Sequence, residues 1–140
     1  MPVAAIAPNE TRAVERLMRF LAVEGVTGHE KAIAQAVIGA LVQAGVPRSA
    51  IRFDRAHRRI PLPTETGNLI VQLPGTRKGP RRLFMTHLDT VPLCAGAKPV
   101  RKGNRIVAAG PTALGGDNRT GVAALVTLAA TLIERRLPHP

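Results

Sequence analysis

Every residue between Val122 and Ile133 is apolar or threonine, and this run constrains the fold more than any other part of the sequence. It lies within a helix predicted from Asn118 to about Arg136, where Arg135 and Arg136 are cations of the kind favoured at a helix C-terminus. A helix that is apolar on most sides is normally buried inside a larger protein. The sequence therefore predicts that other elements cover this helix.

Two amphipathic helices are predicted before it. The first begins at Asn9 and stops before Gly25, and its apolar face carries, at helical spacing, Val14, Leu17, Met18 and Leu21. Thr27 is predicted to cap the second helix, with Glu30 at the capping-box position. The apolar stripe of that helix runs from Ile33 to Leu41.

Short strand candidates lie between the helices, at Ser49–Asp54, Leu69–Leu73, Leu83–Thr86 and Arg105–Ala108. The apolar run Leu83–Thr86 suits a central strand buried on both faces. Val91 to Arg105 is predicted as a connection rich in glycine, proline and lysine. Helices interleaved with strands predict an α/β layer architecture, and a length of 140 residues allows one domain.

The charge balance raises the question of a nucleic-acid partner. Twenty Lys and Arg against nine Asp and Glu give a formal net charge of +11, and 16 of the cations are Arg. The Arg-rich segments Arg48–Arg59 and Arg77–Arg82 could bind an acidic partner such as RNA. Aromatic residues make up only 2% of the chain, which disfavours single-strand binding because bases stack on aromatic faces.

Membrane and secretory classes are disfavoured as well. No run reaches the roughly 18 apolar residues that mark a membrane-spanning helix. The start, Met1–Glu10, lacks a basic region and has only a short apolar stretch interrupted by proline, which is a poor signal peptide. The single cysteine, Cys94, fits a reducing compartment. We therefore expect a cytoplasmic protein without a membrane partner.

The chemistry-bearing residues are His87 and Asp89 at a predicted strand end, and Asp117, 30 residues after His87, at the turn into the last helix. Strand ends and helix N-termini are where open α/β sheets place ligands. Imidazole and carboxylate are zinc ligands, and Asp89 could hold the second ring nitrogen of His87. Taken alone, a hydrogen-bonded histidine and a helix N-cap at Asp117 are the simpler interpretations.

Three stretches together resemble a known family. They are Thr66–Gly75 (TGNLIVQLPG), Met85–Val91 (MTHLDTV) and Leu114–Ala123 (LGGDNRTGVA). In this order and spacing they look like the N-terminal part of the peptidase T-like zinc exopeptidases, which are related to glutamate carboxypeptidase, aminoacylase and succinyl-diaminopimelate desuccinylase. The resemblance covers nearly all of residues 10–140 and implies a three-layer mixed sheet with helices on both faces, as an incomplete catalytic domain.

The resemblance also implies residue roles. His87 would ligate one zinc ion, Asp117 would bridge two zinc ions, and Asp89 would be the catalytic residue that orients His87. A cis peptide bond is expected after Asp117. Asn118 and Arg119 stand where many relatives have an acidic residue and Lys, a departure that removes one carboxylate near the metals but no ligand.

Other family features fall outside the motifs of this sequence. The resemblance expects a Glu-Glu pair on the strand after the last helix, holding a general base and a zinc ligand, then a further acidic ligand, a lid or dimerisation domain and a final histidine. Residues 1–140 are therefore expected to be the N-terminal portion of a metallopeptidase catalytic domain. The whole enzyme would hydrolyse short peptides with two zinc ions, and the resemblance is compatible with a homodimer. This portion alone should bind zinc weakly and be inactive. The alternative is a non-enzymatic remnant of the fold that binds RNA through its Arg-rich segments.

Overall fold

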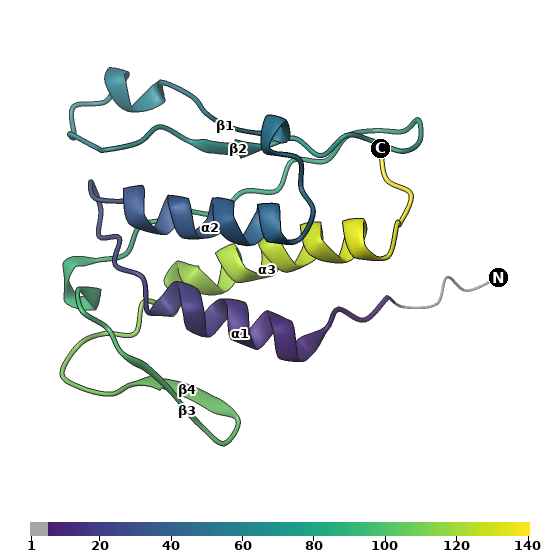
Figure 1. Cartoon of the computed structure of the whole chain (residues 1–140). Coiled ribbons are helices and arrows are strands. Elements are labelled where there is room, and N and C mark those ends of the chain that lie inside the picture. Colours follow the sequence, from purple (N-terminus) through teal and green to yellow (C-terminus); the bar gives the residue numbers. More distant parts are fainter. Residues whose placement is uncertain (1–5) are drawn as a thin grey trace.

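The computed structural model describes residues 6–140 and shows helices stacked between two small hairpins (Figure 1). The helices are α1 (Glu10–Leu21), α2 (Lys31–Gln43) and α3 (Gly116–Glu134), with short 3-10 turns at Arg48–Ala50, Ala56–Arg59 and Pro92–Cys94. The strands are β1 (Ile51–Phe53), β2 (Leu69–Val71), β3 (Pro99–Lys102) and β4 (Arg105–Ala108). Residues 1–5, on which part of the argument against a signal peptide rests, lie outside the described residues.

The core lies where the three helices meet. Its side chains are almost fully buried and come mainly from one face of each helix: Phe20, Ile33, Val37, Leu41, Val122 and Val126. Each of the three helices contacts the other two, and α3 packs against both α1 and α2. The apolar periodicity predicted from the sequence therefore corresponds to the real interfaces of α1 and α2.

Helix α3 is buried on one side and partly exposed on the other. Val122, Val126 and Ala130 face the core, whereas Leu128 is 38% exposed. Within the described residues, α1 and α2 cover one side of this helix, as predicted. Its other side keeps apolar surface in contact with solvent.

The sheets are two separate antiparallel pairs. In the first, Ile51 of β1 lies opposite Val71 of β2, and in the second, Pro99 of β3 lies opposite Ala108 of β4. The predicted α/β class is confirmed. The wide mixed sheet that the family resemblance implies is not formed within residues 6–140.

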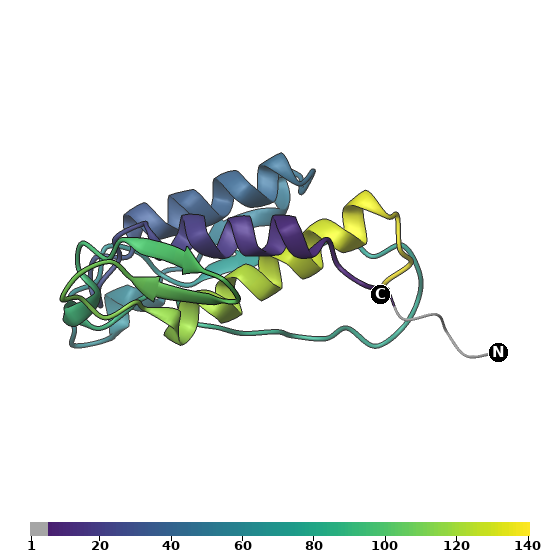
Figure 2. The same ribbon diagram turned by 90° about the horizontal axis from the view of Figure 1, so that it is seen from below.

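The predicted central strand, Leu83–Thr86, is wrong for this structure. No strand is formed between Gln72 and Asp89, and the chain runs there as a long extended segment (Figure 2). Leu83 is 83% and Met85 81% exposed, because no neighbouring strand in the described residues supplies hydrogen-bond partners or covers their side chains. Conversely, β3 forms within the stretch predicted as a connection.

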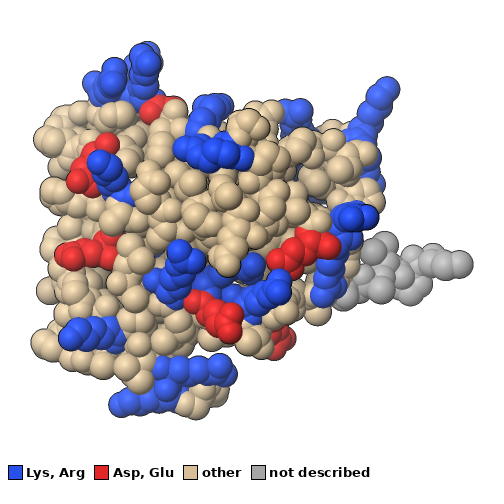
Figure 3. Space-filling view, viewed as in Figure 1, with Lys and Arg blue, Asp and Glu red and all other residues tan. Residues whose placement is uncertain are grey.

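On the face seen in Figure 3, positive and negative side chains are mixed. Lys and Arg side chains are spread over the face seen in Figure 3, and Asp and Glu side chains lie among them. Among the helices of residues 6–140, none has the length and apolar character needed to cross a membrane.

Candidate metal site

The candidate site forms where the extended segment ends and α3 begins. His87 and Asp89 lie at the end of that segment, and Asp117 lies at the turn that opens α3. Gly115 makes the turn with a φ of 79°, a left-handed conformation that favours glycine. A Cβ on Gly115 would also come within 3.1 Å of the Thr90 side chain. The turn can therefore place Asp117 beside His87 only with a residue as small as glycine.

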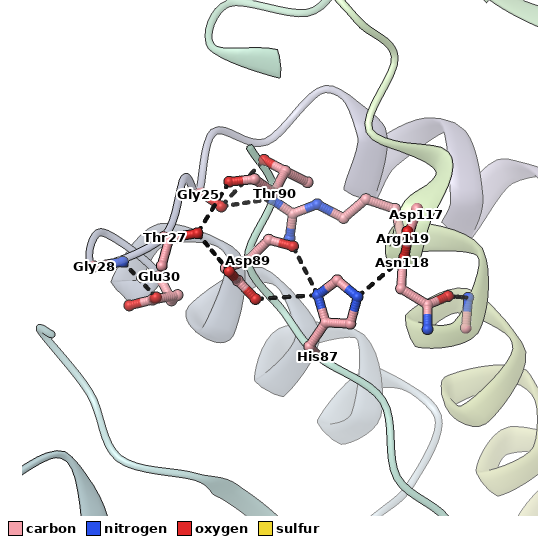
Figure 4. Close-up of polar contacts among 11 residues, drawn as sticks. Gly25, Thr27, Gly28, Glu30, His87, Asp89, Thr90, Asp117, Asn118 and Arg119 are labelled. Carbon is pink, nitrogen blue, oxygen red and sulfur yellow. Dashed lines mark hydrogen bonds and ion pairs between the residues drawn. The ribbon is translucent and has the colours of Figure 1, made fainter. Parts of the chain in front are cut away.

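The imidazole of His87 lies between two carboxylates (Figure 4). Its Nδ1 is 3.0 Å from Asp89 Oδ1 and 3.0 Å from the backbone carbonyl oxygen of Asp89. Its Nε2 is 3.1 Å from Asp117 Oδ1. Both neighbours of Nδ1 can only accept a hydrogen bond, so Nδ1 carries a proton. Nε2 faces the Asp117 carboxylate, which also only accepts, so without a cation at the site Nε2 favours a proton as well.

The two carboxylates change the acid–base properties of the ring. Burial of His87 acts to lower its pKa, but the hydrogen bonds to Asp117 and Asp89 outweigh burial, and the pKa of His87 is raised. Burial acts to raise the pKa of Asp89, but the hydrogen bonds from Thr27 and His87 prevail, and the pKa of Asp89 is lowered. The site therefore favours an ionised Asp89 next to a proton on Nδ1.

Asp117 is not a helix N-cap. Its side chain is 92% exposed and contacts His87, while Asn118 accepts a hydrogen bond from the Gly121 amide at 2.9 Å. Asp117 and Asn118 have non-helical backbone angles, and the peptide bond between them is cis, as the resemblance implied. The capping role thus belongs to Asn118, and the Asp117 carboxylate is free to face His87.

Thr27 is not a helix cap either, which corrects the prediction made from the capping box. Its hydroxyl donates to Asp89 Oδ2 at 2.5 Å, although Asp89 lies 62 residues further along the chain. The first amide of α2, that of Lys31, donates instead to Glu65 Oε2 at 3.0 Å. The capping-box pattern describes a local interaction, whereas here the Thr27 hydroxyl and the first amide of α2 bind carboxylates that lie far along the sequence.

Arg119 is the residue of this region that sequence reasoning missed. Its side chain is only 2% exposed, and its Nη2 donates to the carbonyl oxygens of Val23 at 3.2 Å and Gly25 at 3.4 Å. Burial lowers the pKa of Arg119 to about 10, although the negative charge of Asp89 opposes that shift. The sequence signal that could have indicated this role is a single cation, Arg119, at the N-terminal end of a helix whose following turns are apolar.

The residues fit zinc as part of a site. Imidazole nitrogen and carboxylate oxygen are zinc ligands, and two ligand atoms of a tetrahedral zinc ion lie roughly 3.4 Å apart. The 3.1 Å between His87 Nε2 and Asp117 Oδ1 is close to that separation. Within residues 6–140, no group of three or more His, Cys, Asp or Glu side chains is arranged to hold a metal ion. His87 and Asp117 would therefore supply two ligands if zinc bound here, with the Asp89 carboxylate behind the His87 ring.

Comparisons with known proteins agree with a peptidase origin. No protein-family model matches the chain. An uncharacterised Bacillus subtilis protein, YqjE, is 29% identical over 132 residues, which are 94% of this chain and 34% of YqjE.

Two crystal structures have the same fold over 94% of this chain. A tripeptidase from Staphylococcus aureus superposes with a TM-score of 0.82 at 25% identity. The aminopeptidase PepT from Bacillus cereus superposes with a TM-score of 0.78 at 29% identity. The chain spans about a third of each of these proteins, 34% in both cases. In sequence and fold it therefore resembles part of a peptidase T-like domain.

Proposed function

We propose that this chain is the N-terminal portion of the catalytic domain of a di-zinc exopeptidase that hydrolyses short peptides. The observation that carries the proposal is the position of His87, held at Nδ1 by Asp89 and facing Asp117 with Nε2. The neighbouring solved peptidases, whose names describe a tripeptidase and an aminopeptidase, supply the substrate class.

Each of the three residues has one role in this proposal. His87 binds zinc through Nε2, and Asp117 offers a solvent-exposed carboxylate whose two oxygens can bind two ions. Asp89 keeps the proton on Nδ1, so that the lone pair of Nε2 stays available. Zinc, when bound, supplies a Lewis acid that polarises the scissile carbonyl and lowers the pKa of a bound water.

Two ligands do not complete a catalytic zinc site, which needs three from the protein. The remaining ligands and the general base would come from a part of the enzyme beyond the third that this chain spans. We therefore expect residues 1–140 alone to bind zinc weakly and to release no amino acid from a tripeptide.

The chain has four histidines, which makes zinc binding at His87 directly measurable. In a titration of the ¹⁵N-labelled chain with Zn²⁺, we expect the ring nitrogens of His87 to shift first. His29, His57 and His139 serve as internal controls, and Asp117→Asn should weaken the His87 response. Equal shifts at all four histidines, or an unchanged response in Asp117→Asn, would reject the assignment.

Turnover is the second measurement. Release of the N-terminal amino acid from a tripeptide is assayed with and without Zn²⁺. Rapid zinc-dependent turnover by residues 1–140 would show that the chain is not merely a portion of the site.

The alternative of RNA binding through Arg48–Arg59 and Arg77–Arg82 rests on charge alone. Of the three phenylalanines, Phe20 is buried and Phe53 half-buried, so Phe84 is the aromatic residue exposed for base stacking. Binding to an unrelated polynucleotide that weakens steeply with salt would favour this alternative. A cytoplasmic location and a homodimeric whole enzyme are further parts of the main proposal, to be checked by cell fractionation and by the mass of the full-length protein in solution.

A further inference from the structure

Asp89 is held at both of its carboxylate oxygens. Oδ1 accepts from His87 Nδ1 at 3.0 Å, and Oδ2 accepts from the Thr27 hydroxyl at 2.5 Å. A carboxylate bound at one oxygen can still rotate about its Cβ–Cγ bond, whereas one bound at both oxygens by separate elements is fixed. The direction of the His87 ring therefore depends on the loop that carries Thr27.

That loop is attached to the site by its backbone as well. The Thr27 amide donates to the Thr90 carbonyl at 3.0 Å, and the Thr90 amide donates back to the Gly25 carbonyl at 3.0 Å. Val26 and Thr90 form an isolated parallel bridge. The loop between α1 and α2 thus runs beside the residues that follow His87, which places the Thr27 hydroxyl at Asp89.

Arg119 also binds the loop between α1 and α2, through the loop's backbone carbonyls. The Gly25 carbonyl receives three donors: the Thr90 amide, the Thr90 hydroxyl at 3.3 Å and Arg119 Nη2 at 3.4 Å. Figure 4 shows the Arg119 side chain reaching from the start of α3 toward Gly25 and Thr90. Arg119 follows Asp117 by two residues. The start of α3 therefore carries the candidate ligand Asp117 and also holds the Thr27 loop, which orients the second candidate ligand, His87.

From these contacts we infer that Thr27 is a positioning residue for His87, acting through Asp89, and that Arg119 holds the loop in place for it. The inference rests on the proposed function in so far as His87 binds zinc. Its structural part, the orientation of the His87 ring, holds without any metal.

Two substitutions at Thr27 form a matched pair. Thr27→Val removes the hydroxyl at nearly constant size, and Thr27→Ser keeps it. Thr27 is exposed, so neither change opens a cavity in the core. In the metal-free chain we expect an exchange-protected Nδ1 proton on His87 in the original protein and in Thr27→Ser. In Thr27→Val we expect faster exchange of this proton, because the Asp89 side chain is no longer fixed and only the Asp89 main-chain carbonyl stays in place. Backbone amide spectra verify that the fold is intact.

Zinc affinity is the second readout, taken from the shift of the His87 ring nitrogens as Zn²⁺ is added to the chain. Thr27→Val should weaken zinc binding by about 10-fold to 100-fold, which is the usual effect of removing a partner behind a metal ligand. Thr27→Ser should stay within a factor of about three of the original protein.

The two readouts separate the two ideas. If Thr27→Val keeps the protected Nδ1 proton and binds zinc as the original protein does, Thr27 does not position His87. If the original chain binds no zinc at His87, the proposed function fails, and the proton measurement still decides the role of Thr27 because it is made without metal.

Discussion

Gly25 lies at a point where three parts of the chain approach too closely for a side chain. A Cβ at this position would come within 2.6 Å of Ile33 Cγ2 and 2.8 Å of Arg119 Nη2. Ile33 is fully buried and Arg119 nearly so, so neither can move away freely. The absence of a side chain at Gly25 is therefore a packing requirement, and its carbonyl links the loop to the candidate site.

We predict that Gly25→Ala destabilises the fold by about 1–3 kcal/mol, the usual cost of overpacking a filled interior. Gly39→Ala is the matched control, because its Cβ would meet nothing within 4 Å and Gly39 lies inside α2. That control should stabilise the fold by roughly 0.5–1 kcal/mol, since alanine loses less backbone entropy in a helix. Urea denaturation followed by circular dichroism measures both, and a neutral Gly25→Ala would contradict the packing argument.

Asp54 ties together the two ends of the loop between β1 and β2. Its carboxylate accepts from the amides of Ala56 at 3.0 Å and Asn68 at 2.8 Å, and from the Asn68 side chain at 2.8 Å. The Ala56 amide and the Asn68 side chain lower the pKa of Asp54 most, because they bind the charged form. Ionised Asp54 therefore contributes stability above its unfolded pKa, near 3.8, and this contribution is lost as pH falls through its lower folded pKa.

The expected result is a pH-dependent difference between the original protein and Asp54→Ala. At neutral pH the variant should unfold at a lower urea concentration, and the two midpoints should approach each other as pH falls below about 4. All other carboxylates are common to both proteins, so the difference isolates Asp54. A gap between the midpoints that stays constant with pH would show that the lost contacts are not those of an ionised carboxylate.

At the scale of elements, the sequence was informative where contacts are local. The helical spacing of apolar residues, Leu17 among them in α1 and Leu41 in α2, predicted both helices, because the apolar residues of a helix mark the face that it buries. The capping prediction at Thr27 is wrong: the residue types match a capping box, but the Thr27 hydroxyl binds the distant Asp89 carboxylate. The site pairing of His87 with Asp117 was expected from motifs, whereas the support from Arg119 depends on tertiary packing that no local pattern encodes.

The strand errors have different causes. Pro99–Lys102 shows no alternation of apolar and polar residues, but it pairs with Arg105–Ala108 across the two residues Gly103 and Asn104. A Gly-Asn pair between extended segments is a hairpin signal, and Gly103 has a φ of 61°. Leu83–Thr86 has the composition of a buried strand, but a strand forms only with a partner, and residues 6–140 do not provide one there.

The uneven burial of the helices leads to a prediction about their leucines. Leu41 of α2 is almost fully buried, whereas Leu128 of α3 is 38% exposed. Leu41→Ala should cost about 2–5 kcal/mol, because it removes buried methyl groups and leaves a cavity. Leu128→Ala should stay within about 0.5 kcal/mol of the original protein, as expected for a surface change. Equal losses on chemical denaturation would mean that the exposed side of α3 is covered in solution.

At the scale of the whole molecule, the most unusual surface is the extended segment that carries Leu83 and Met85. It exposes large apolar side chains and has unpaired backbone groups, and such an edge can pair with the same edge of another molecule. The cations that precede it, Arg77, Lys78, Arg81 and Arg82, oppose such pairing by repulsion between copies. The balance of these two effects should govern how the protein behaves at high concentration.

We predict that the chain self-associates through this segment and that the double change Leu83→Lys with Met85→Lys weakens association about tenfold or more. The control is Leu62→Lys with Leu93→Lys, which adds the same charge at two other exposed leucines. Sedimentation equilibrium at several protein concentrations and two salt concentrations measures all three proteins. If both double variants reduce association equally and added salt restores it, net charge rather than the segment controls association. If only the Leu83 and Met85 variant dissociates, the exposed segment is the contact, because an unpaired strand gains both hydrogen bonds and apolar burial when it meets a second one.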